Sequence, residues 1–130
     1  MTESNEGRRE VDEFILEQIE TVPHLEALLL LWHSRPKPWS VDEMAQRLFL
    51  GPSTVRDILL DLARRGLIRT IAAALETYQY ESEPGRDRLM ALVALTYRED
   101  LIRLSRLIHS KPSAAVRDFA RAFRLKKENY

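Results

Sequence analysis

The sequence predicts a mainly α-helical fold that contains one small β-hairpin. Apolar residues recur at helical spacing along most of the 130-residue chain, and capping residues stand where the expected helices begin. The apolar period changes from about 3.6 to about 2 only after Gly66. Hydrophobic residues make up 45% of the chain and charged residues 31%, which is usual for a soluble globular domain with a buried core.

Two helices are expected near the N-terminus. The first spans about residues 8–20, where apolar side chains share one face and glutamates take the other. Thr21 suits the N-cap of the second helix, with Pro23 in its first turn, where a missing N–H costs nothing. This helix is expected to end before the Arg35-Pro36-Lys37-Pro38 stretch, because a residue that precedes proline disfavours the helical conformation.

Two further helices are expected on either side of a tight turn. Ser40 and Glu43 form an S-x-x-E capping box at the start of the first of them. Gly51 and Pro52 suit the N-cap and first position of the second, which is expected to run to residue 65. Gly66 then ends it, since glycine readily adopts the left-handed conformation that follows many helices.

A β-hairpin and two more helices are expected in the remainder of the chain. The strands are placed at Leu67–Ile71 and Thr77–Ser82, with an apolar tip between them. A single long helix is predicted from about residue 86 to residue 109. Ser110 suits the cap of a last helix, in which Phe119 and Phe123 share a face.

The order helix–helix–helix–strand–strand is that of a winged helix, a three-helix core with a two-stranded hairpin wing. The stretches Met44–Leu48, Gly51–Arg56 and Leu62–Ile68 together resemble the helix-turn-helix core of MarR- and Lrp-type bacterial transcriptional regulators. The resemblance covers roughly residues 38–82. We therefore expect an N-terminal acidic amphipathic helix at 1–21, a winged-helix domain at 22–84 and a C-terminal helical extension at 85–130.

The resemblance implies a DNA-binding regulator whose recognition helix begins at residue 52. Ser53 and Thr54 would donate to phosphates, and Arg56 would reach a guanine edge or a phosphate. Arg47 and Arg64 would add contacts to the DNA backbone. Arg64 has a second interpretation, because a cation in the last turn also complements the helix dipole.

Two features of the sequence favour contacts with protein over contacts with double-stranded DNA. Asp57 and Asp61 are expected on the exposed side of the recognition helix, where they oppose phosphates unless they accept a hydrogen bond from cytosine. The wing tip, residues 72–76, has the sequence AAALE and holds no cation to neutralise phosphate. The leading prediction is a DNA-binding transcriptional regulator, and the alternative is an adaptor that binds another protein through its apolar wing.

The long C-terminal helix carries more apolar surface than a small winged-helix core can cover. In a homodimer its stripe would pack across a two-fold axis, as terminal helices do in regulators of the resembled type. Alternatively, this helix folds back on its own domain, with Phe119 and Phe123 covering it. The net charge is −5 over residues 1–35 and +6 over residues 86–130, so opposite ends of two subunits would attract. The residues predicted for dimerisation are Leu89, Val93, Tyr97, Leu101, Leu104 and Ile108.

The sequence argues against an enzyme, a metal site and a cofactor. It has no cysteine, and its three histidines lie at spacings that form no metal-binding motif. It has neither a glycine-rich phosphate loop nor a G-x-S-x-G nucleophile elbow. We expect a cytoplasmic protein without a membrane partner, because no apolar run is long enough to cross a bilayer and no signal segment precedes residue 10.

Overall fold

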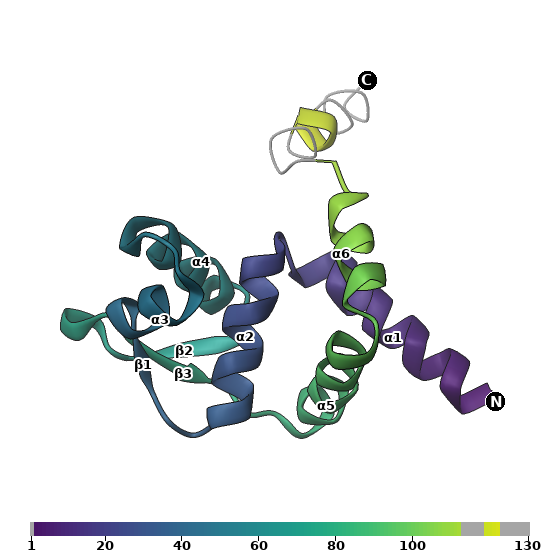
Figure 1. Cartoon of the computed structure of the whole chain (residues 1–130), viewed down its shortest axis with the longest axis horizontal. Helices are drawn as coiled ribbons and strands as arrows, with labels where there is room; N and C mark the ends of the chain where they lie inside the picture. Colours follow the sequence, from purple (N-terminus) through teal and green to yellow (C-terminus); the bar gives the residue numbers. More distant parts are fainter. Residues whose placement is uncertain (1, 113–118, 123–130) are drawn as a thin grey trace.

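The computed structural model describes residues 2–112 and 119–122 and shows a winged helix with a helical extension packed beside it (Figure 1). The predicted mainly α fold with a winged-helix core is therefore confirmed. A short 3₁₀ turn, Ala73–Leu75, forms the wing tip. The elements follow in the order α1 (Thr2–Gln18), α2 (Val22–Ser34), β1 (Trp39–Ser40), α3 (Val41–Leu48), α4 (Pro52–Arg64), β2 (Ile68–Ala72), β3 (Thr77–Tyr80), α5 (Pro84–Glu99) and α6 (Leu101–His109).

Local capping interactions set the predicted helix boundaries. The Thr21 hydroxyl oxygen accepts a hydrogen bond from the backbone N–H of His24 at the start of α2. Ser40 and Glu43 make both hydrogen bonds of the capping box of α3, each 3.1 Å long. Gly66 has a φ of 76°, a left-handed conformation that glycine adopts without strain after α4. The predicted caps at these positions are confirmed.

The sheet contains one more strand than the predicted hairpin. Its order is β1-β3-β2, and all neighbouring strands are antiparallel. Trp39 and Ser40 of β1 pair with Tyr78 and Thr77 of β3. A strand of two residues is too short to show a period of 2, so no local pattern indicates it. By this pairing, the loop after α2 is attached to the wing.

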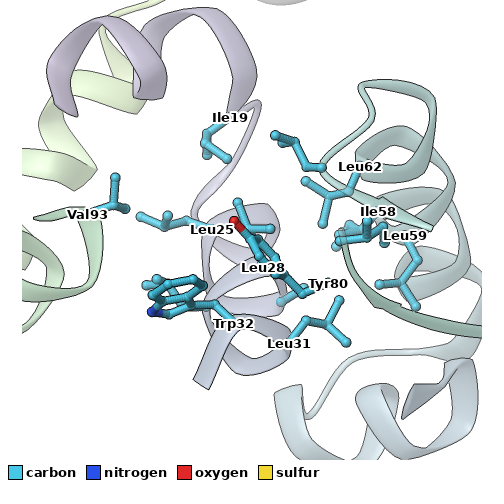
Figure 2. Close-up of a cluster of buried hydrophobic side chains, with 14 of the residues drawn as sticks. Ile19, Leu25, Leu28, Leu31, Trp32, Ile58, Leu59, Leu62, Tyr80 and Val93 are labelled. Atoms are coloured by element: carbon cyan, nitrogen blue, oxygen red, sulfur yellow. The ribbon is translucent and has the colours of Figure 1, made fainter. Parts of the chain in front are cut away.

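Helix α2 forms the centre of the hydrophobic core and is buried on opposite sides. Leu28 and Leu31 lie toward α4 and the sheet, whereas Leu25 points toward Val93 of α5 (Figure 2). A helix that is apolar all round belongs in the interior of a protein. One continuous hydrophobic cluster consequently includes residues of α1, of the winged helix and of α5 and α6.

The predicted single helix over residues 86–109 is wrong. The chain leaves the helical conformation at Asp100, where φ is −148° and ψ is 55°, and continues as the separate helix α6. Both α5 and α6 pack against α1. Arg103 of α6 binds Asp12 of α1 at 2.7 Å and Asp100 at 3.2 Å. The break at Asp100 lets each helix direct its own apolar face toward α1.

The predicted last helix lies mostly outside the described residues. Residues 119–122 are helical, and the Phe119 side chain is exposed instead of covering the preceding helices. Phe123 is outside the described residues.

Lys111, which follows α6, contacts the end of α1. Its Nζ donates hydrogen bonds to the carbonyl oxygens of Ile15, Leu16 and Ile19. These contacts place a cation where the helix dipole of α1 is negative.

Candidate nucleic-acid interface

Helices α3 and α4 form a helix-turn-helix, and the first half of α4 is exposed beside the wing (Figure 1). The face of α4 that includes Val55 and Leu59 is buried in the core. The opposite face exposes Ser53, Thr54 and Asp57. This split follows from the helical period of the sequence, which separates apolar from polar positions.

Arg56 lies between α4 and the wing and binds Glu76 at the wing tip. Arg56 Nε donates to one carboxylate oxygen of Glu76, and Arg56 Nη2 donates to the other at 3.0 Å. These hydrogen bonds raise the pKa of the Arg56 guanidinium and lower the pKa of the Glu76 carboxyl. No local sequence signal indicates this pair, because it depends on how the hairpin folds against α4.

Carboxylates surround Arg56 on this surface. Asp42 of α3 and Asp57 of α4 add to the effect of Glu76 in raising the pKa of Arg56. Asp57 is exposed, as the sequence predicts. The positive charge of Arg56 is thus balanced by its own neighbours, and the described wing tip from residue 72 to residue 76 carries no cation.

The structure does not gather all the predicted DNA-contacting residues on one surface. Arg47 lines a hollow of about 270 Å³ that is also lined by Glu26 and His33 of α2 and by Tyr97 of α5. Arg64 lies at the C-terminal end of α4, where Nη2 donates to an Asp61 carboxylate oxygen at 3.1 Å. By contrast, the other four predicted residues share the N-terminal half of α4.

The prediction that Asp61 faces solvent is wrong. Its side chain is only 17% exposed and lies between α4 and the start of α2. Asp61 Oδ2 is 3.3 Å from His24 Nε2 and accepts from Arg65 Nε at 3.0 Å. The Thr21 hydroxyl is 2.6 Å from His24 Nδ1. This arrangement suits a neutral His24 whose Nε2 carries the proton toward Asp61, because a carboxylate only accepts, and whose Nδ1 accepts from the Thr21 hydroxyl.

Burial of His24 makes the stability of the fold depend on pH. Burial is the main cause that lowers the pKa of His24, although the nearby Asp61 and Glu20 oppose it. The unfolded chain therefore binds a proton at a higher pH than the folded chain does. Below about pH 6.5, the ordinary histidine pKa, the unfolded state binds more protons and the free energy of unfolding decreases.

This effect of His24 can be isolated with one variant. Urea unfolding of the parent between about pH 7.5 and about pH 5.5 should show decreasing stability, whereas His24→Gln should show a smaller decrease. The lowered pKa values of Glu76 and Asp87 affect stability mainly below about pH 5, where these carboxyls become protonated in the unfolded chain, and so below this range. Equal pH slopes for the parent and the variant would contradict the assignment to His24.

Several of the residues predicted for dimerisation are packed inside the single chain. Val93, Leu104 and Ile108 are buried in the chain's own core, as the folded-back alternative implies. Leu89 and Tyr97 are partly buried against the same cluster. A second copy cannot contact the three buried side chains while α5 and α6 lie on α1. Of the six residues, only Leu101 has an exposed side chain.

Two other kinds of feature, a metal site and a membrane-spanning helix, were sought in the described part of the chain. Within residues 2–112 and 119–122, no three histidine, aspartate or glutamate side chains gather as metal ligands. In the same part of the chain, no helix combines the length and the apolar character needed to cross a membrane.

Comparisons with known proteins identify similar structures only. No protein-family model and no curated protein matches the sequence. The chain is similar to MepR, a transcription regulator of the Staphylococcus aureus multidrug efflux pump MepA, at 17% identity and a TM-score of 0.49, over 98% of this chain and 92% of that one. It is also similar to a MarR family protein from Bacillus stearothermophilus, at 17% identity and a TM-score of 0.46, over 97% of this chain and 86% of that one.

Proposed function

We propose that the protein is a cytoplasmic DNA-binding transcriptional regulator of bacterial winged-helix type, with α4 as its recognition helix. The observation that carries this proposal is the exposed N-terminal half of α4, held beside the wing by a buried opposite face. The major groove of DNA admits an α-helix, whose N-terminal residues contact the base edges. Ser53 and Thr54 stand where the helix dipole is positive and would bind phosphates.

Arg56 is the residue proposed to contact a base. It is the cation on the exposed first half of α4, and it is placed between that helix and the wing. An arginine in the major groove donates two hydrogen bonds to guanine more often than to any other base. Arg47 on α3 and Arg64 at the C-terminal end of α4 are exposed and are proposed to contact phosphates away from Arg56, with Asp57 accepting from cytosine.

We further propose that the regulator is a homodimer. Leu95 of α5 and Leu101 and Ile102 of α6 are exposed apolar residues on the helices that flank the break at Asp100. Burial of such side chains against a second copy would remove apolar surface from water. The dimer would place two α4 helices about 34 Å apart, one helical turn of DNA.

The proposal is tested by measuring, with fluorescence anisotropy, how the full chain binds mixed duplex DNA. The parent is expected to bind at about 50 mM salt and to weaken steeply toward about 200 mM. Arg56→Ala is expected to weaken binding to the duplex sequences that the parent prefers by about tenfold, because it removes the proposed base contact. Arg88→Ala, which removes an exposed arginine of α5, should change binding little.

The result of this experiment also decides between two functions. An adaptor that binds another protein is favoured by Leu75, which is 73% exposed at the wing tip, and by the carboxylates around Arg56. A folded parent that binds no DNA at low salt would contradict the regulator and support the adaptor. Binding to a partner protein should then depend little on salt, because an apolar contact is not screened.

A further inference from the structure

The ion pair between Arg56 and Glu76 joins the recognition helix to the wing. The two residues are 20 positions apart, and each side chain is 41% exposed. Both oxygens of the carboxylate accept from the guanidinium, so the pair is bidentate. It lies at the surface that the proposed function assigns to DNA.

The backbone holds Glu76 in a defined position. Its φ of 47° is in the left-handed region, at the end of the 3₁₀ turn of the wing tip. The backbone N–H of Glu76 donates to the Ala73 carbonyl oxygen at 3.1 Å, and its own carbonyl oxygen accepts from the Val41 N–H at 3.1 Å. The carboxylate of Glu76 is therefore presented by a backbone that is bonded both to the wing and to α3.

Glu76 occupies one edge of the Arg56 guanidinium and leaves the end of the group available. The hydrogen bonds use Nε and Nη2, and Nη1 has no hydrogen-bond partner among the described residues. A guanidinium has five N–H donors in one plane. Nη1 and the second N–H of Nη2 still form a pair of parallel donors, which matches the O6 and N7 acceptors of guanine in the major groove.

The charges near Arg56 favour selection among bases over general affinity. Glu76, Asp42 and Asp57 balance its positive charge, which weakens its attraction for phosphate. The acceptors of a base edge carry no net charge, so two correctly placed donors still bind them. An arginine paired in this way thus gains little binding free energy from the phosphates of any DNA, and it gains more from a guanine at the right position.

We propose that Glu76 is a positioning residue, which holds Arg56 by one edge so that the free end of the guanidinium reads a guanine in the major groove. This inference rests on the proposed DNA-binding function. The competing arrangement is a brake, in which Arg56 must leave Glu76 before it contacts DNA. Removal of a brake would strengthen binding to all sequences and leave the base preference unchanged.

The test is selection of bound sequences from randomised duplex DNA by the full-length parent and by Glu76→Gln. Glutamine keeps the length of the side chain but lacks the charge and the second acceptor oxygen. The parent is expected to enrich one G·C pair with a preference for guanine over adenine of about tenfold, and Glu76→Gln should reduce this to less than about threefold. Binding of Glu76→Gln to unrelated duplexes should strengthen, because Arg56 is then free to contact phosphates.

Two matched variants separate the hydrogen bonds from the charge. Asp42→Asn removes a neighbouring negative charge, and no hydrogen bond joins Asp42 to Arg56 in the described part of the chain, so the guanine preference should remain. In an Arg56→Ala background, Glu76→Gln should leave the remaining base preference unchanged, because Glu76 acts through Arg56. Thermal unfolding should show that all variants are folded, and Glu76→Asp, whose shorter side chain withdraws the carboxylate, replaces Glu76→Gln if needed.

The outcomes distinguish failure of the inference from failure of the proposed function. A Glu76→Gln protein that binds DNA and keeps the guanine preference overturns the positioning role and indicates a brake. An equal loss of preference in Asp42→Asn overturns the role of the hydrogen bonds. A folded parent that enriches no duplex sequence and binds no duplex overturns the proposed function, and the inference with it.

Discussion

Replacement of Leu28 by alanine is expected to lower the free energy of unfolding by about 3–4 kcal/mol. Leu28 is fully buried in α2, at the centre of the cluster that joins the winged helix to α1 and α5. The substitution removes apolar contacts and leaves a cavity that neighbours on several elements line, so the site cannot easily collapse. This loss is a large part of the roughly 5–15 kcal/mol that stabilises a typical domain.

Urea unfolding followed by circular dichroism measures this effect. The urea concentration at the midpoint of unfolding should decrease. The slope of the unfolding free energy against urea concentration should stay the same, because the surface exposed on unfolding hardly changes. Leu60→Ala, at a position of α4 that is 48% exposed, should cost less than about 1 kcal/mol. Similar losses for the two variants would contradict the central position of α2 in the core.

Replacement of Ile102 by glutamate is expected to dissociate the proposed homodimer. Ile102 is 68% exposed in α6, and it adjoins Leu101 on the surface proposed to contact a second copy. A charge that becomes buried without a partner is costly, and central apolar residues of an interface contribute about 2 kcal/mol or more. The dimer dissociation constant should rise at least about 30-fold.

Light scattering coupled to size-exclusion chromatography, over a range of concentrations, measures the dissociation. Ile71→Glu makes the same change at an exposed position of β2 and should leave the dimer intact. A parent that is monomeric at every concentration would contradict the homodimer. A dimer that Ile102→Glu does not weaken would place the interface on another surface.

The helix-turn-helix and the hairpin were predictable because their signals are local. The capping box joins Ser40 to Glu43, three residues away, and Gly66 ends α4 through its own backbone conformation. The exposed positions Ser53, Thr54 and Asp57 follow from the helical period alone. Interactions of this kind involve residues that stay close in any compact arrangement of the chain.

Asp61 and Asp100 show where helical periodicity is insufficient. Asp61 lies on α4, and only the packing of α4 against the start of α2 leaves its side chain 17% exposed and its Oδ2 3.3 Å from His24 Nε2. The pattern of apolar residues continues across Asp100, so it predicts one helix where the structure has two. The helices separate there because both can then bury apolar side chains against α1.

Helix types, caps and the exposed face of α4 are encoded within a few consecutive residues, because main-chain hydrogen bonds and apolar periodicity act over such distances. Which charged side chains pair with each other is determined only by the tertiary packing of the whole chain. Arg56 pairs with Glu76, which is 20 residues away in the sequence, and Arg103 pairs with Asp12, which is 91 residues away. These pairs depend on which helix faces meet once apolar surface is buried, a result of the whole core that no short segment contains.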